Sequence, residues 1–143
     1  MTYTPPTTEQ KFLLKHIVGM AELAGHDAFA EASADVVEAI VDGAGALAAG
    51  EFAPLNRTGD EIGAKLSPDG VTMPPGFRQA YQAYVDGGWG TLAGPVAYGG
   101  QGLPLTLATI LMEDLGSANM ALSLCMMLSP GAVESGGRRP EQW

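Results

Sequence analysis

The stretch from Gly87 to Leu105 constrains the fold more than any other part of the sequence, because seven of its nineteen residues are glycine. Glycine lacks a Cβ, so it reaches positive φ and lets two backbone segments approach closely. Flexible linkers combine glycine with serine and contain few aromatic residues, whereas this stretch also holds Trp89, Pro95 and Tyr98. We therefore expect a loop of defined shape, flanked by helices.

Apolar residues at helical spacing predict about five helices, and hence a small all-α domain. The expected helices cover residues 7–24, 33–53, 76–86, 104–115 and 118–128. The stretch from Asn56 to Met73 is expected to be irregular, with a turn at Pro68–Gly70. The length of 143 residues allows one domain.

Several helix ends carry sequence signals. Thr7 and Gln10 have the spacing of a capping box, and Ser33 is a candidate N-cap for the second helix. Gly116 is expected to end the fourth helix and Ser117 to cap the fifth. These signals predict where the helices begin and end.

Two of the expected helices have an unusual composition. The second contains Gly43, Gly45 and Gly50, each of which costs about 1 kcal/mol relative to alanine, so close packing must stabilise it. The fifth, Met120–Leu128, is apolar on all sides, which is typical of a buried helix. Ser129–Gly131 is expected to end it.

The charge balance limits the partners that this chain can bind. Sixteen acidic and seven basic residues give a formal charge of −9, which disfavours nucleic acids and anionic membranes. Residues 1–10 lack the charged and apolar regions of a secretory signal. A single cysteine, Cys125, precludes an internal disulfide. We expect a cytoplasmic protein that binds neither nucleic acid nor membrane.

Residue spacing alone predicts no catalytic or metal site. The glycine-rich stretch lacks the Lys-Ser or Lys-Thr end of a phosphate loop and follows a helix, so nucleotide binding there is only a minor alternative. His16 and His26 lack the spacing of metal ligands. Cys125 lies in an apolar segment, where thiols are usually inert. The adjacent Glu113 and Asp114 point to different helix faces, and one or both are expected to be solvated or to act in a cap.

Three motifs occur in a fixed order around the loop. They are Gly-Trp-x-x-Leu-x-x-Pro at Gly88–Pro95, Tyr-Gly-Gly-x-Gly at Tyr98–Gly102, and Glu-Asp-Leu at Glu113–Leu115. This order resembles the N-terminal helical domain of acyl-CoA dehydrogenases. Phe12–His16, Ala53–Arg57 and Ser117–Ala121 are similar to the 3-(methylthio)propanoyl-CoA dehydrogenase branch of that family. The resemblance covers Tyr3 to about Glu134.

The resemblance implies flavin-dependent α,β-dehydrogenation of an acyl-CoA thioester, in which a glutamate removes the α-proton and FAD accepts the β-hydride. The family builds this site from the helical domain, a β-domain that holds much of the FAD, and a C-terminal domain that supplies the glutamate. Its members form homo-oligomers. Because only the first domain is matched, no residue of this chain is assigned a catalytic role. We expect the chain alone to lack FAD and activity.

The helix after Glu-Asp-Leu contributes to the wall of the acyl pocket in this family. The resemblance implies that role for five residues, which also suit an ordinary core: Asn119, Met120, Ser123, Leu124 and Met127. It implies that the glycine loop is a structural junction with the β-domain, anchored by Trp89 and Tyr98. Four further residues are expected to shape its path: Pro95, Gly99, Gly100 and Gly102.

The chain is expected to divide into three parts. Residues 1–30 form an N-terminal extension with a short helix, residues 31–134 form the family domain, and residues 135–143 form a disordered tail outside the family. Because the family's helix continues beyond Glu134, we expect a dehydrogenase cut short by truncation or a frameshift. The alternative is a stand-alone helical interaction or dimerisation module without catalysis.

Overall fold

The computed structural model describes residues 3–137, which are mainly helical. The helices are α1 (Thr7–Leu13), α2 (Met20–Ala24), α3 (Ala34–Leu47), α4 (Leu55–Ile62), α5 (Phe77–Asp86), α6 (Leu105–Ala118), α7 (Met120–Met126) and α8 (Leu128–Gly137). Two π-helical segments, Leu14–Val18 and Ala48–Phe52, continue α1 and α3. Strands β1 (Lys65–Ser67) and β2 (Gly70–Thr72) form one antiparallel hairpin. The predicted helical class is confirmed, with more and shorter helices than expected.

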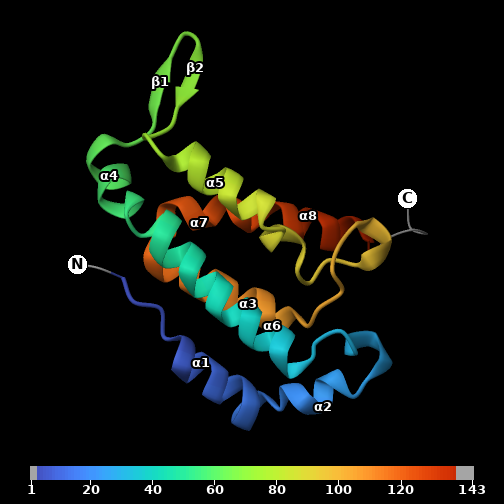
Figure 1. Ribbon diagram of the computed structural model, residues 1–143. Coiled ribbons are helices and arrows are strands. Elements are labelled where there is room, and N and C mark those ends of the chain that lie inside the picture. Colours follow the sequence, from blue (N-terminus) through green and yellow to red (C-terminus); the bar gives the residue numbers. More distant parts are fainter. Residues whose placement is uncertain (1–2, 138–143) are drawn as a thin grey trace.

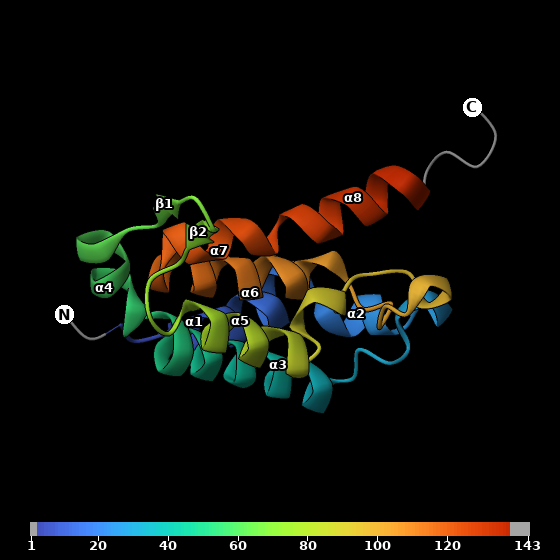
Figure 2. The ribbon, with the colours of Figure 1, turned by 90° about the horizontal axis from the view of Figure 1, so that it is seen from above.

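Helix α6 lies at the centre of the arrangement. α3 packs along α6, α1 packs against α3, and α7 turns back against α6 (Figure 1). Seen from above, α3 and α5 lie on one side of α6, while α7 and α8 lie on the other (Figure 2). The hairpin projects away from this body beyond α4 and α5 (Figure 1).

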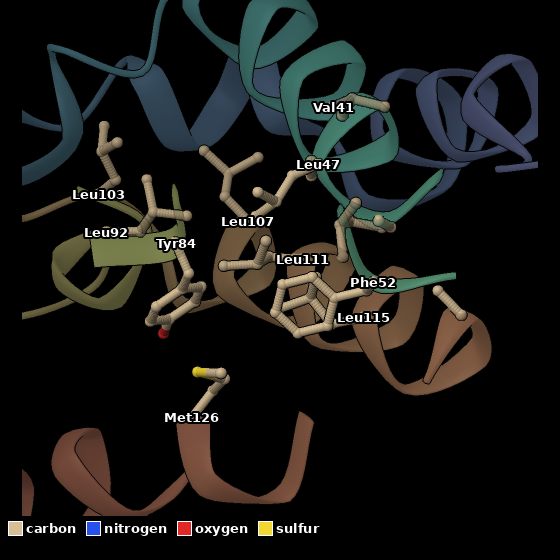
Figure 3. Close-up of a cluster of buried hydrophobic side chains, with 14 of the residues drawn as sticks. Val41, Leu47, Phe52, Tyr84, Leu92, Leu103, Leu107, Leu111, Leu115 and Met126 are labelled. Carbon is tan, nitrogen blue, oxygen red and sulfur yellow. The ribbon is translucent and has the colours of Figure 1, made fainter. Parts of the chain in front are cut away.

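The core forms where α3 and its π-helical continuation meet α6. Val41 and Phe52 on the first side, and Leu107 and Leu115 on the second, are fully buried. Figure 3 shows these side chains converging, with Leu92, Leu103 and Tyr84 extending the cluster toward the glycine loop. The helical spacing of the apolar residues therefore produces one continuous core.

Close packing explains two of the three glycines in the second predicted helix. A Cβ on Gly43 would lie 2.7 Å from Cη2 of Trp89, and a Cβ on Gly45 would lie 2.8 Å from Cγ2 of Thr7. Both distances are below van der Waals contact, so only glycine admits these neighbours. A Cβ on Gly50 would meet nothing within 4 Å.

The predicted caps have mixed outcomes. Ser33 caps α3, because its Oγ accepts a hydrogen bond from the backbone N–H of Val36 at 3.4 Å. The predicted capping box is wrong: Pro6 is the N-cap of α1 and no side chain caps this end. The side chain of Gln10 is buried and donates instead to Asp114, a tertiary partner that local spacing does not reveal.

The prediction that residues 56–73 are irregular is wrong. α4 begins directly after Pro54, and Gly59 on this helix lies so close to the ring of Phe77 that an added Cβ would be 2.6 Å away. The turn within the stretch is confirmed. Oγ of Ser67 accepts from the N–H of Asp69 and donates to the carbonyl of Gly70, both at 3.2 Å. The strands are too short for alternation to predict them.

The boundary between α6 and α7 also differs from prediction. Gly116 lies inside α6, and the break occurs at Asn119, whose backbone is extended with φ −158°. The N-cap of α7 is Asn119 and not the predicted Ser117, because Oδ1 of Asn119 accepts a hydrogen bond from the N–H of Leu122 at 3.1 Å. Ser129–Gly131 does not end the last helix but lies in the first turns of α8, where Pro130 is tolerated.

The division of the chain into an extension, a domain and a tail stays a prediction. Leu14 and Met20, within the predicted extension, belong to the same buried cluster as α3 and α6. α8 runs to Gly137, so residues 135–137 of the predicted tail are helical. The predicted disorder of residues 138–143 lies outside the described residues.

Candidate functional site

The glycine-rich loop connects α5 to α6 by a closed path containing two 3-10 turns, Trp89–Thr91 and Val96–Tyr98. Three backbone hydrogen bonds of 2.9 Å join its two arms, donated by Gln101, Gly102 and Leu103 to the carbonyls of Thr91, Gly94 and Leu92. A Cβ on Gly100 would lie 2.0 Å from the carbonyl oxygen of Gly94. The two arms therefore meet at a point where only glycine fits.

Many of the backbone donors of this loop are used within its own fold. The N–H groups of Thr91, Gly94 and all six residues from 98 to 103 donate to carbonyls within the loop. A phosphate-binding loop instead points unpaired N–H groups at the anion. This geometry does not support the minor alternative of a nucleotide site.

The two predicted anchors of the loop behave differently. Trp89 packs against the buried core and fits closely over Gly43. Tyr98 is 68% exposed, so it does not anchor the loop within the described residues. Nε2 of Gln101 instead ties the arms together, because it donates to the carbonyl of Gly88 at 2.9 Å and to Oγ1 of Thr91 at 3.1 Å.

The five residues of the predicted acyl-pocket wall separate into two groups. Asn119 and Ser123 are buried and serve the fold: Nδ2 of Asn119 donates to the carbonyl of Phe52 at 3.2 Å, and Oγ of Ser123 donates to that of Met120 at 2.9 Å. Met120, Leu124 and Met127 are 61%, 55% and 55% exposed. The expectation that this helix is buried on all sides is therefore wrong.

The exposed residues form an apolar stripe, which we define as Met120, Leu124 and Met127. Their spacing of four and three residues places them on one helix face. Leu128 at the start of α8 is also exposed. Within the described part of the chain, no helix is both long enough and apolar enough to cross a membrane.

A partly open surface cavity of about 200 Å³ lies between α5, the glycine loop and the junction of α7 with α8. Tyr84 and Cys125 line it. Burial, followed by the neighbouring Tyr81 and Cys125, raises the pKa of the Tyr84 phenol. Burial also raises the pKa of the Cys125 thiol, whose Sγ donates to the carbonyl of Leu122 at 3.1 Å. These effects keep both groups protonated, so Cys125 is not an activated nucleophile.

Sequence comparison gives this geometry a context. No family model matches the chain. The chain is 32% identical over 135 residues to 3-methylmercaptopropionyl-CoA dehydrogenase of Ruegeria pomeroyi, and the match covers 94% of this chain and 23% of that protein. It is 25% identical over 122 residues to the broad-specificity linear acyl-CoA dehydrogenase FadE5 of Mycobacterium tuberculosis, covering 84% of this chain and 20% of that protein.

The homologues of this chain are acyl-CoA dehydrogenases. The chain spans between a fifth and a quarter of the length of these two relatives. The helical fold is consistent with the N-terminal helical domain of an acyl-CoA dehydrogenase. The glycine loop, whose motifs carry the resemblance, connects α5 to α6 by a path that its own hydrogen bonds close.

The sequence did not predict one polar cluster, which consists of Tyr3, Gln10 and Asp114. Oδ1 of Asp114 accepts from Nε2 of Gln10 at 2.9 Å and from the hydroxyl of Tyr3 at 3.0 Å. Asp114 is fully buried, whereas Glu113 is exposed. The signal was present, because Asp114 falls on the same helical stripe as Leu107, Leu111 and Leu115.

This cluster fastens the N-terminal segment to α6. It is incompletely satisfied, because Oε1 of Gln10 and Oδ2 of Asp114 have no hydrogen-bond partner among the described residues. Burial, the hydrogen bond to Asp114 and the nearby acidic charges raise the pKa of Tyr3. The described residues contain no group of three or more His, Cys, Asp or Glu side chains that could hold a metal. The cluster holds the N-terminal segment against α6 by hydrogen bonds.

Proposed function

We propose that this chain serves as the N-terminal helical domain of an acyl-CoA dehydrogenase and that its apolar stripe forms part of the acyl-pocket wall. The homology to two acyl-CoA dehydrogenases supports the first part. The exposure of Met120, Leu124 and Met127 is the observation that carries the second. In this proposal, residues 31–134 are the domain, the acyl-CoA thioester is the substrate, and the assembled enzyme is a homo-oligomer.

The physical properties of the stripe suit an acyl chain. Fully burying a side chain such as leucine or methionine contributes about 1.5–3 kcal/mol, and all three residues retain more than half of their exposure here. Methionine is flexible and polarisable, so it adapts to apolar chains of different shape. The stripe therefore gains stability when an acyl chain or another domain covers it.

The chemistry of dehydrogenation must come from elsewhere in the enzyme. FAD is the hydride acceptor that the family implies, but the cavity beside the glycine loop is about 200 Å³, below the 300–1,000 Å³ of sites for drug-sized ligands. That cavity does not fit FAD. In our proposal the residues of this chain bind and orient the acyl group, and the chain alone is inactive. A cytoplasmic location stays a prediction.

The proposal is testable in a chimaera. The matched region of the Ruegeria pomeroyi dehydrogenase would be replaced by this chain, and the flavin absorbance and the reduction of an electron acceptor by acyl-CoA would be measured. We expect bound flavin and measurable reduction. A chimaera that retains flavin but reduces no acceptor would contradict the proposed role, because the fold would be present without a working acyl site.

Substitutions in the chimaera test the stripe itself. Leu124→Trp fills the proposed acyl path, and we expect KM for a long-chain acyl-CoA to rise about tenfold while the flavin content is unchanged. Leu66→Trp in the hairpin is the matched control, because Leu66 is 84% exposed and lies outside the stripe. Equal effects of the two substitutions on KM would contradict the proposal that the stripe lines the acyl pocket.

The second candidate function is a helical interaction or dimerisation module without catalysis. The exposed stripe favours it as well, because contiguous apolar surface marks interaction sites. Light scattering on the purified chain separates the two. A stable, discrete dimer would favour the module, whereas heterogeneous association or partial unfolding would favour a domain that lacks its partners.

A further inference from the structure

We propose that the polar cluster of Tyr3, Gln10 and Asp114 binds one buried water molecule, which donates its two hydrogens to Oε1 of Gln10 and Oδ2 of Asp114. This inference does not rest on the proposed function. It follows from two buried oxygen atoms that lack a hydrogen-bond donor among the described residues and that belong to the two partners of one hydrogen bond.

These two oxygens differ from the other buried polar groups of the chain. Four polar or charged side chains are buried in the part that the structure describes: Gln10, Asp114, Asn119 and Ser123. The side chains of Asn119 and Ser123 have hydrogen-bond partners. Oε1 of Gln10 and Oδ2 of Asp114 have none within residues 3–137. Native structures rarely leave such atoms unsatisfied, so a donor is expected at this place.

The two oxygens lie on neighbouring groups. Nε2 of Gln10 donates to Oδ1 of Asp114 at 2.9 Å. Oε1 shares its carbon with Nε2, and Oδ2 shares its carbon with Oδ1, so each unsatisfied oxygen is directly beside this hydrogen bond. An O–H group donates to an oxygen over about 2.7–2.8 Å. One water molecule between the two oxygens can therefore reach both.

The chemistry of the cluster calls for a ligand that donates twice. An amide oxygen and a carboxylate oxygen both accept, so neither satisfies the other. The hydroxyl of Tyr3 already donates to Oδ1 of Asp114 at 3.0 Å, and Nζ of Lys11 donates to Asp42 at 2.7 Å. Water donates two hydrogens, and a buried water is held by two to four polar partners. The two oxygens supply two of them.

The N-terminal segment encloses this place. Asp114 is 0% exposed and Gln10 is 2% exposed. A Cβ on Gly45 would lie 2.8 Å from Cγ2 of Thr7 and 3.0 Å from Cβ of Pro5, so the segment between Tyr3 and Gln10 lies directly against α3. A water beneath it exchanges slowly with solvent, and it joins α1 to α6 in addition to the direct hydrogen bonds.

Nuclear Overhauser spectroscopy between water and the isotope-labelled full chain tests the proposal. We expect a cross-peak between the side-chain amide protons of Gln10 and the water resonance, with opposite signs in the laboratory-frame and rotating-frame spectra, because the bound water tumbles with the protein. Exchange of the Tyr3 hydroxyl hydrogen with solvent produces a similar cross-peak. Tyr3→Phe removes that route and keeps both oxygens, so the cross-peak should persist in this variant.

A double variant removes the site itself. Gln10→Met combined with Asp114→Leu replaces both unsatisfied oxygens by apolar groups. Magnetic relaxation dispersion of the water oxygen nuclei measures how many long-lived waters each protein holds, and the amplitude should fall by the contribution of one water. Circular dichroism checks that the helical content is retained. If the double variant does not fold, the cross-peak in the natural chain and in Tyr3→Phe decides the proposal.

Three results would overturn the proposal. The first is the absence of the cross-peak in Tyr3→Phe, or equal dispersion amplitudes in the natural chain and a folded double variant. The second is a melting temperature that rises saturably with K⁺ in the natural chain alone, because a monovalent cation would then occupy the site. The third is an infrared band of a protonated carboxyl group that disappears in Asp114→Asn, because Asp114 would then supply the hydrogen.

Discussion

Helices α3 and α7 lie on different sides of α6, and their apolar residues have different fates. Val41 and Ala44 of α3 are fully buried, whereas Met120, Leu124 and Met127 of α7 are more than half exposed. Both helices are predominantly apolar. Apolar composition therefore shows that a helix has surface to bury, but it does not identify what covers that surface.

Small residues explain why α3 is covered. Gly43 and Gly45 let Trp89 and the N-terminal segment approach α3 from two directions, while α6 covers its inner face. On α7, Leu122, Ser123 and Met126 face inward and the stripe faces outward. The difference between the two helices is thus a difference in neighbours.

The largest expected effect separates two leucines. Leu111→Ala, at a site that is 2% exposed, should lower the free energy of unfolding by about 3 kcal/mol, because it leaves a cavity in the hydrophobic core around α6. Leu124→Ala, at a site that is 55% exposed, should change it by less than about 0.5 kcal/mol. Urea denaturation followed by circular dichroism measures both. Equal losses would mean that α7 is already covered in the isolated chain.

The next effect concerns the closed path of the glycine loop. Gly100→Ala should lower the free energy of unfolding by about 2–3 kcal/mol, because the new methyl group meets the carbonyl of Gly94. Gly50→Ala is the matched control, since a Cβ there meets nothing within 4 Å, and it should be neutral or stabilising by up to about 1 kcal/mol. A tolerated alanine at position 100 would show that the arms of the loop separate easily.

A smaller effect is expected at the start of α7. Asn119→Ala removes both the cap and the hydrogen bond to the buried carbonyl of Phe52, and should cost about 2 kcal/mol. Ser33→Ala, at an exposed cap of α3, should cost about 0.5–1 kcal/mol. Thermal unfolding compares the two. If Ser33 proves more important, Asn119 does not hold α7 to the core.

The smallest effect is a dependence on alkaline pH. Burial and the hydrogen bond to Asp114 raise the pKa of Tyr3 above its ordinary value of about 10. The folded state thus holds this proton more tightly, so the contribution is complete below pH 10 and is lost as the pH rises above it. We expect the stability of the natural chain to fall more steeply above pH 10 than that of Tyr3→Phe. Parallel curves would exclude Tyr3 as the cause.

The helical class, the shaped loop and the N-cap of α3 were predictable because each depends on nearby residues. Apolar periodicity, clustered glycines and a serine before a helix act over a few positions. The fastening of Gln10 to Asp114 was not predictable from spacing, since 104 positions separate the two residues. The wall residues were named from resemblance, and their assignment to the acyl pocket stays a prediction.

The sequence by itself determined that the chain is helical, that its glycine-rich stretch is a structured loop, and that it resembles acyl-CoA dehydrogenases. These conclusions rest on local conformational preferences and on a fixed order of motifs. Tertiary structure alone decided which apolar faces are covered, that Asn119 rather than Gly116 divides α6 from α7, and that a cavity forms beside Tyr84. Burial depends on surfaces that meet across the fold, and a residue's neighbours in sequence do not specify those surfaces.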